Sequence, residues 1–174
     1  ILSIKEIEFV DRPPKIRFQE KTQVDFKDFP VRGKPQKDSP GILIIDSGIT
    51  SNHPYLKDSI GDAIAIATND NSHIKPDDPN DDVGHGTQVA GVALYGDIQE
   101  CISSNNFKPE YWIFSSKVMY KDEYGFATYD EKELLEHQLY SAVTRIIDNY
   151  PQCKIINLSL GNPEYRMSTG VRQF

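Results

Sequence analysis

The chain has 174 residues, with 19 basic and 26 acidic side chains and a net charge of −7. That length corresponds to one domain or to part of a larger one. An acidic chain is poorly suited to nucleic-acid binding, which needs basic side chains to replace phosphate counterions. Its apolar runs are far shorter than the roughly 20 residues of a membrane span. We therefore expect neither nucleic acid nor a membrane as a partner.

The first 40 residues are charged and rich in proline, and they show no basic segment followed by an apolar one, so no signal peptide is visible. The two cysteines, Cys101 and Cys153, are too few for a disulfide framework. These features favour the cytoplasm without deciding between a secreted and an intracellular protein. We expect residues 1–40 to be an N-terminal extension or linker and residues 41–174 to form the domain. The role of the extension stays open between a propeptide remnant, a linker to an upstream domain and an edge strand.

Two short apolar segments near the start of the domain predict strands, at 42–45 and 63–67. Unbroken apolar runs of this kind are typical of strands buried on both faces of a parallel sheet. A stretch rich in Asp, Asn and Pro follows over 68–82, and we interpret it as a solvated acidic loop.

A helical pattern begins at His85, after which apolar residues recur at helical spacing, and Gly96 is expected to end the helix. Gly91 inside this helix costs about 1 kcal/mol relative to Ala, so we expect close packing at that position. A third strand is expected over 112–119.

The clearest helical pattern spans 131–149, with its apolar residues on one face and Pro151 after its end. Asp130 and Glu133 resemble an N-terminal capping box. A fourth strand is predicted over 155–161. Because strands and helices alternate, the sequence predicts an α/β fold, a parallel sheet with crossover helices.

Asp46 directly follows the first predicted strand, and His85 lies between two glycines at a helix start. Sites form at the carboxyl ends of the strands in open parallel sheets, so Asp46 is a candidate functional group. Its alternative role is to accept backbone N–H groups and cap the loop. An imidazole at position 85 with a carboxylate partner could act as a general base, although a histidine in a loop is more commonly a surface residue.

Ser159, Leu160 and Gly161 close the last predicted strand. They are either a plain strand-to-loop turn or a strand end whose backbone pairs with an extended peptide.

Three segments, in this order along the chain, carry a resemblance to a known family. They are Ile44-Ile45-Asp46-Ser47-Gly48-Ile49, His85-Gly86-Thr87-Gln88-Val89-Ala90-Gly91 and Ile156-Asn157-Leu158-Ser159-Leu160-Gly161. Together they resemble the subtilisin-like serine proteases, the subtilases (peptidase S8), over about residues 41–162. Asn52-His53-Pro54 and Lys117-Val118 add to the resemblance.

The resemblance implies a subtilisin-like serine endopeptidase, which hydrolyses peptide bonds with an Asp-His-Ser triad. Asp46 matches the triad aspartate, which orients the histidine and stabilises its protonated form. His85 matches the triad histidine, the general base and later the general acid. Ser159, Leu160 and Gly161 match the strand that binds the substrate backbone near the primary specificity pocket.

Glu123, Tyr124 and Gly125 fall where the family's opposing substrate-binding segment lies, judged by their spacing from Lys117-Val118. The implied partner is a peptide or protein substrate, whose preferred cleavage site the sequence does not define. No cofactor is expected, because the best-known calcium site of the family takes an Asp directly after His-Pro, and Tyr55 stands at that position here.

The residues after Gly161 contain no Gly-Thr-Ser, the motif that carries the subtilase nucleophile well beyond the Ser-Leu-Gly strand. Ser168-Thr169-Gly170 has the wrong order, and the oxyanion-hole Asn of the family has no counterpart either. We therefore expect a truncated, N-terminal part of a subtilase domain. It should have no peptidase activity alone, while its parent protein hydrolyses peptide bonds.

The family's sheet continues past this last strand. In the truncated chain we expect an exposed sheet edge, and an uncovered packing face on the helix over 131–149, to favour self-association.

Two alternatives stay open. A non-catalytic, subtilase-like module would bind peptides without cleaving them, and the downstream sequence would distinguish it by lacking Gly-Thr-Ser. A metal-dependent hydrolase would use Asp46, His85 and the acidic loop, and it would hold stoichiometric metal after dialysis.

Overall fold

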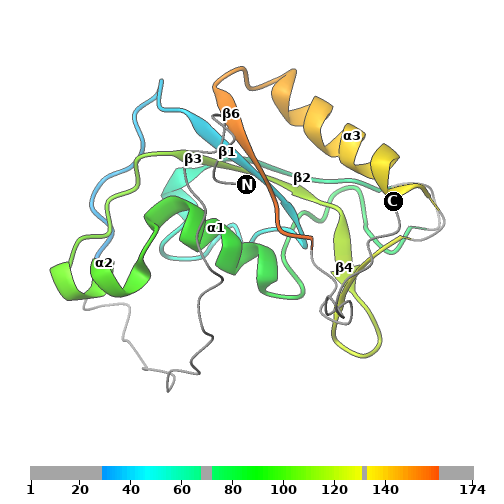
Figure 1. Ribbon diagram of the computed structural model, residues 1–174, viewed down its shortest axis with the longest axis horizontal. Helices are drawn as coiled ribbons and strands as arrows, with labels where there is room; N and C mark the ends of the chain where they lie inside the picture. The colour runs from blue at the N-terminus through cyan, green and yellow to red at the C-terminus, as the bar shows by residue number, and fades with distance from the viewer. Residues whose placement is uncertain (1–28, 68–71, 131–132, 161–174) are drawn as a thin grey trace, which may run out of the picture.

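The structure of the chain is a computed structural model that describes residues 29–67, 72–130 and 133–160 (Figure 1). Its elements in chain order are β1 (Gly41–Asp46), the 3-10 turn η2 (Lys57–Ser59), β2 (Ile60–Ala65), α1 (His85–Tyr95), α2 (Ile98–Ser104), β3 (Trp112–Lys117), β4 (Met119–Lys121), β5 (Ala127–Tyr129), α3 (Leu135–Ile147) and β6 (Cys153–Leu158).

The main sheet has four parallel strands in the order β2-β3-β1-β6, and β4 and β5 form a separate antiparallel hairpin. Helix α1 lies in the connection from β2 to β3, and α3 in the connection from β5 to β6. The two helices lie on opposite faces of the sheet (Figure 1). This is the α/β fold predicted from the sequence, and it is consistent with the subtilisin fold.

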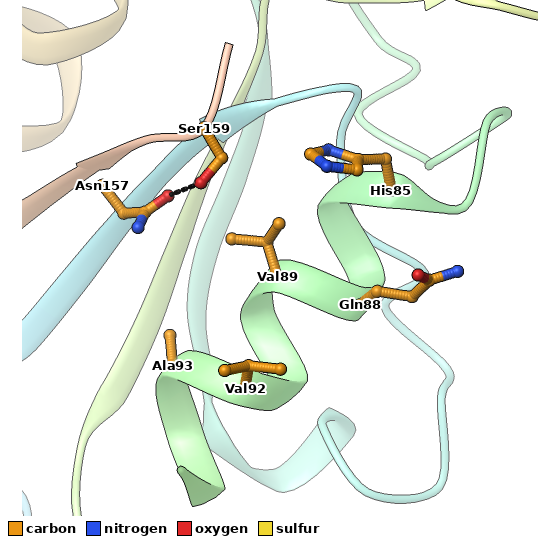
Figure 2. A pocket seen from close by; sticks show the side chains of 7 residues that line it. All are labelled: His85, Gln88, Val89, Val92, Ala93, Asn157 and Ser159. Atoms are coloured by element: carbon orange, nitrogen blue, oxygen red, sulfur yellow. Dashed lines mark hydrogen bonds between the residues drawn. The ribbon is translucent and has the colours of Figure 1, made fainter. Parts of the chain in front are cut away.

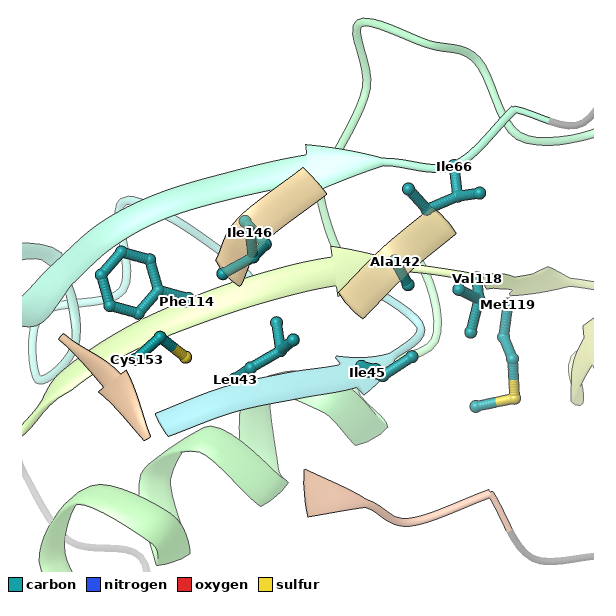
Figure 3. Close-up of a cluster of buried hydrophobic side chains, with 9 residues drawn as sticks. All are labelled: Leu43, Ile45, Ile66, Phe114, Val118, Met119, Ala142, Ile146 and Cys153. Carbon is teal, nitrogen blue, oxygen red and sulfur yellow. The ribbon is translucent and has the colours of Figure 1, made fainter. Parts of the chain in front are cut away.

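The α3 face of the sheet carries one hydrophobic core, built from alternate residues of β1 and β3 and from the inner side of α3 (Figure 3). Its buried members are Leu43, Ile45, Ile66, Phe114, Val118, Met119, Ala142, Ile146 and Cys153. Ala142 and Ile146 have no exposed surface. The expectation of an uncovered packing face on this helix is therefore wrong, because α3 buries that face against β1 and β3.

The α1 face carries a second core, to which β1 contributes the other half of its side chains. Its buried members are Ile42, Ile44, Ile49, Leu56, Ala90, Leu94 and Ile113. Every residue of β1 is buried. The strand has a helix over each face, which is why its sequence is an unbroken apolar run.

Strand β6 contains an irregularity that decides which of its side chains lie on the α1 face of the sheet. Gly41 pairs with Cys153 but Ile42 pairs with Ile155, so one residue of β6 is bulged out of the register. Side chains alternate along a strand, so a one-residue insertion turns all later side chains to the opposite face. Ser159 thereby shares the α1 face of the sheet instead of the α3 face.

Helix α3 begins without the capping box expected from Asp130 and Glu133. The helix starts at Leu135, its N-cap residue is Leu134, and no side chain caps it. Instead, the buried Gln138 donates from Nε2 to the carbonyl oxygens of Asp130 (2.9 Å) and Glu133 (3.1 Å). A residue inside the helix thus holds the incoming chain, a contact that sequence spacing does not indicate.

The other boundaries differ from the prediction by a few residues. The second strand covers Ile60–Ala65, the third ends at Lys117, and the fourth covers Cys153–Leu158. Close packing at Gly91 is also wrong, because a Cβ built there meets no atom within 4 Å in the described part of the chain.

Residues 29–40, the part of the N-terminal extension that the structure describes, contact the domain. Val31 forms an isolated parallel bridge with Phe107, and the indole Nε1 of Trp112 donates to the carbonyl oxygen of Gln36 (2.7 Å). Among the described helices, none is long and apolar enough to cross a membrane.

Candidate active site

Asp46 is the last residue of β1 and has no exposed surface. Its Oδ1 accepts the backbone N–H of Ser47 (2.7 Å) and lies 2.8 Å from Nδ1 of His85, while its Oδ2 lies 2.9 Å from the same nitrogen. The carboxylate therefore caps the strand end and also faces the imidazole. A buried carboxylate at this distance fixes the orientation of the ring.

His85 is the first residue of α1, and Gly84 precedes it with a left-handed φ of 96°. Its side chain is 46% exposed, so the imidazole is open to solvent although Nδ1 faces the buried Asp46. Nε2 makes no hydrogen bond within the described part of the chain. A hydrogen bond at Nδ1 leaves Nε2 as the basic nitrogen of the neutral ring, available to take a proton from a reacting group.

The start of α1 approaches the end of β1 closely. A Cβ added to Gly86 would overlap the carbonyl oxygen of Gly48 and would lie 3.2 Å from Cβ of Asp46. Glycine at this position is thus what lets the helix bring His85 to the strand end.

Asp81 is a residue of this site that sequence reasoning missed. We expected it to be part of a solvated acidic loop, but it is only 9% exposed. It accepts the hydroxyl of Ser47 (2.8 Å) and the hydroxyl of Thr87 (2.6 Å), and it also accepts several backbone N–H groups at the start of α1. The cue in the sequence was its position four residues before His85, just ahead of the matching helix motif.

Lys117 at the end of β3 is 3% exposed and pairs in register with Asp46. Its Nζ donates to the carbonyl oxygen of Asn80 (2.7 Å) and lies 3.4 Å from Oδ2 of Asp82. The lysine therefore fixes the loop segment that contains Asp81, and its charge is compensated by the carboxylate of Asp82.

An open groove of about 380 Å³ lies between α1 and the end of β6 (Figure 2). Its lining residues are His85, Gln88, Val89, Val92, Ala93, Asn157 and Ser159. The groove joins His85 to the end of the predicted substrate-binding strand. The hydroxyl of Ser159 donates to Oδ1 of Asn157 (2.7 Å) (Figure 2).

The remaining predicted substrate-binding residues occupy two other places. Leu160 packs at the edge of the core on the α3 face, and Gly161 lies outside the described residues. Glu123, Tyr124 and Gly125 lie in the turn of the β4–β5 hairpin. They are not among the residues that line the groove.

The hairpin turn has its own internal hydrogen bonds. Oδ1 of Asp122 accepts the backbone N–H groups of Tyr124 (2.9 Å) and Phe126 (2.8 Å), and the N–H of Gly125 bonds to the carbonyl oxygen of Asp122 (3.1 Å). These three bonds use the backbone N–H groups of Tyr124, Gly125 and Phe126 within the turn itself. Tyr124 is 76% exposed.

The position of the family's calcium ligand is filled by an aromatic contact. Tyr55 is 8% exposed, its ring centroid lies 4.6 Å from that of Phe107, and its hydroxyl donates to the carbonyl oxygen of Phe29 (2.6 Å). A buried phenol of this kind cannot take the place of a carboxylate ligand.

The two carboxylates nearest His85, those of Asp46 and Asp81, are already engaged in hydrogen bonds. Both oxygens of Asp81 accept hydrogen bonds from N–H and O–H donors, and both oxygens of Asp46 face an imidazole nitrogen. Within residues 29–67, 72–130 and 133–160, no three His, Cys, Asp or Glu side chains come together as a metal-binding group.

The fold places a buried Asp46 in contact with His85 at the carboxyl end of a parallel sheet, an arrangement that occurs in one class of serine peptidases. The sequence matches the subtilase family (peptidase S8) over residues 38–173. This match covers most of the chain, so the chain belongs to the subtilase family. No curated protein matches it.

Proposed function

We propose that this chain supplies the acid–base half of a serine endopeptidase site, with Asp46 as the orienting carboxylate and His85 as the general base. The observation that carries the proposal is the contact between the buried Asp46 carboxylate and Nδ1 of His85, at 2.8 and 2.9 Å, with the ring open to solvent on its other side. A carboxylate so placed holds the imidazole in one tautomer and stabilises the imidazolium that forms during catalysis.

The chemistry expected at this pair is acyl transfer. Nε2 of His85 takes the proton of a serine hydroxyl as its oxygen attacks the peptide carbonyl carbon. The imidazolium then gives this proton to the leaving amine as the C–N bond breaks. In the second half of the reaction, Nε2 takes a proton from water as the water oxygen attacks the acyl carbon. The imidazolium then returns this proton to the serine oxygen as the acyl C–O bond breaks, which releases the carboxylic acid product.

The groove beside His85 is the proposed place for the substrate. Ser159, Leu160 and Gly161 would pair with the backbone of an extended peptide, as the matching strand does in the family that they resemble. Glu123, Tyr124 and Gly125 would border the same peptide from the β4–β5 hairpin. The open groove between Ser159 and His85 supports the first part of this proposal.

The two serines nearest the Asp46–His85 pair, Ser47 and Ser159, both have hydroxyls engaged in other hydrogen bonds. The hydroxyl of Ser47 donates to Asp81 (2.8 Å) and accepts the N–H of Gly86 (3.1 Å), so it is committed to holding the site together. Ser159 donates to Asn157. We propose that the nucleophile and the oxyanion donors lie outside these 174 residues, so that this chain alone has no peptidase activity.

The test is an endopeptidase assay with a quenched fluorescent protein substrate. We expect no hydrolysis by the 174-residue chain, and hydrolysis by a longer translation product of the gene. In that longer product, His85→Ala or Asp46→Asn should lower kcat by about 10⁴-fold, while Asp77→Asn in the exposed part of the loop should leave it unchanged. A longer product that binds peptides but never cleaves them would support a binding module instead.

A further inference from the structure

The side chain of Asp81 is the most heavily hydrogen-bonded group in the described part of the chain. It accepts from the hydroxyls of Ser47 (2.8 Å) and Thr87 (2.6 Å), and from the backbone N–H groups of Val83 (3.1 Å), Gly84 (2.8 Å) and Thr87 (2.8 Å). One donor is on Ser47, the residue after β1, and the other four are on residues 83–87, where the chain enters α1. The carboxylate therefore connects the two elements that carry Asp46 and His85.

Asp81 does for α1 what an N-cap side chain usually does. The N-cap residue of α1 is Gly84, which has no side chain to accept the free N–H groups of the first turn. The Asp81 carboxylate reaches the N–H of Thr87, the third residue of the helix, from outside the helix. A negative charge at this end also complements the helix dipole.

The connection to Asp46 runs through Ser47. The Ser47 hydroxyl donates to Asp81 and accepts the N–H of Gly86, the residue after His85. Ser47 directly follows Asp46 and donates its own N–H to the Asp46 carboxylate (2.7 Å). The chain of bonds from Asp81 thus reaches the Asp46 carboxylate and the backbone of Gly86, the residue next to His85.

The carboxylate itself is well fixed. Lys117, buried at the end of β3, bonds to Asn80 and Asp82 on either side of Asp81. Burial raises the pKa of Asp81, but the hydrogen bonds from Thr87, Gly84 and Ser47 outweigh burial and lower the pKa below its ordinary value. The five donors therefore favour the ionised form.

We propose that Asp81 is a positioning residue, which holds His85 at hydrogen-bond distance from Asp46 by joining the end of β1 to the first turn of α1. The inference deepens the proposed function, because it assigns a residue that acts on the reaction only through Asp46 and His85. Asp81 does not line the groove and has no contact with the place proposed for the substrate.

The proposal can be separated from a purely structural role of Asp81. A helix cap that served stability alone would lower the melting temperature when removed but would leave the Asp46–His85 hydrogen bond intact. A positioning residue must also change that bond. The readout is therefore the proton on Nδ1 of His85, whose NMR resonance lies far downfield when it is bonded to a carboxylate.

The experiment uses the 174-residue chain labelled with ¹⁵N-histidine, and Asp46→Asn assigns the resonance by removing it. Asp81→Asn keeps the size of the side chain but replaces one acceptor oxygen by an NH₂ donor, so it cannot satisfy both Ser47 and Thr87. Ser47→Ala removes the hydroxyl that bridges Asp81 and the N–H of Gly86 but leaves the other four donors to Asp81, so it is the milder variant. Asp77→Asn, an exposed acid of the same loop, is the matched control for charge.

We expect Asp81→Asn and Ser47→Ala each to abolish the Nδ1 resonance, or to raise its exchange rate with water by at least about tenfold. Asp77→Asn should leave both unchanged. Thermal unfolding establishes that each variant is folded, and if Asp81→Asn does not fold, Ser47→Ala decides the outcome.

A folded Asp81→Asn or Ser47→Ala variant with an unchanged resonance and exchange rate would overturn the proposal. The readout needs no nucleophile, so an inactive chain does not affect it. If the original chain showed no such resonance at all, the Asp46–His85 pair would not form, and the proposed function would fail together with the inference. If the resonance persists in the variants, only the role of Asp81 fails.

Discussion

Gly86 is the residue at which helix α1 comes closest to the end of β1, and it sits between His85 and the Thr87 that Asp81 holds. A methyl group there would overlap the carbonyl oxygen of Gly48 and crowd Asp46. The backbone must shift to relieve the overlap, so Gly86→Ala should lower the free energy of unfolding by about 1–3 kcal/mol and displace His85 from Asp46.

Gly91 in the same helix provides the matched control. It is a helix-interior glycine, and a Cβ at that position meets no described atom within 4 Å. Gly91→Ala should therefore raise the free energy of unfolding by about 0.5–1 kcal/mol. Urea unfolding of both variants makes the comparison, and equal effects at the two positions would contradict the close approach at Gly86.

His53 and Asp81 predict how stability depends on pH. Burial lowers the pKa of His53 below its ordinary value of 6.5, so the unfolded chain takes up a proton before the folded chain as the pH falls through 6.5. The unfolding free energy should therefore decrease with falling pH from about 6.5 downward. Asp81, whose pKa is lowered from 3.8, adds a second loss at still lower pH.

Urea unfolding between pH 7.5 and pH 5 tests the first part of this prediction. The difference between the original chain and His53→Gln isolates the contribution of this histidine from that of the other three. We expect the slope with pH to be smaller in His53→Gln. Identical slopes would show that burial does not shift the pKa of His53.

At the scale of elements, helix α3 shows what the sequence could and could not predict. The apolar periodicity predicts the helix and its buried face, because packing against the sheet requires the same spacing that the pattern shows. The predicted capping box is absent. Instead, Gln138, inside the helix, donates to the carbonyl oxygens of Asp130 and Glu133. Local motifs therefore predict that a helix exists better than they predict the contacts at its first residues.

Some residues of the candidate site could likewise be predicted from the sequence, and others could not. Asp46 and His85 could be found because each lies at the end of an element in a short motif. Asp81 was missed, because its bond to Ser47 joins residues 34 positions apart in the chain, which only the fold brings together. The face on which Ser159 lies was hidden for a similar reason, since the bulge in β6 reverses the simple alternation.

Neighbouring isoleucines near the end of α3 test how this helix is held. Ile146 has no exposed surface and belongs to the core on the α3 face, whereas Ile147 is 38% exposed. Ile146→Ala should lower the free energy of unfolding by about 2–5 kcal/mol. Ile147→Ala should cost less than about 1 kcal/mol, since less apolar surface is lost. Similar losses in chemical denaturation would contradict the assigned face of α3.

At the scale of the whole molecule, β6 is the last strand in the described part of the sheet, and its side chains are exposed on both faces. Ile155, Ile156 and Leu158 are 49%, 43% and 54% exposed. The same edge on a second copy offers the same backbone groups and apolar side chains, so two copies can pair edge to edge around a two-fold axis. We propose that a second copy of this chain covers β6 when no further strand does.

Light scattering during size-exclusion chromatography tests this self-association. The mass of the 174-residue chain should rise towards that of a dimer with concentration, and Ile156→Lys should shift it back to the monomer. Tyr140→Lys, at a residue that is 72% exposed on α3, is the control. A chain that stays monomeric at high concentration would contradict the proposal.

The central claim is that these 174 residues contain the Asp–His pair of a subtilase without its nucleophile. Fluorophosphonate labelling of the purified chain tests it most directly, with intact-mass detection and a heat-denatured control, because the probe forms an adduct only with an activated serine. We predict no adduct on the folded chain. A stoichiometric adduct that forms on the folded chain but not on the chain denatured before labelling would contradict the claim, and Ser159, in the groove with His85, would then be the first serine to replace by alanine.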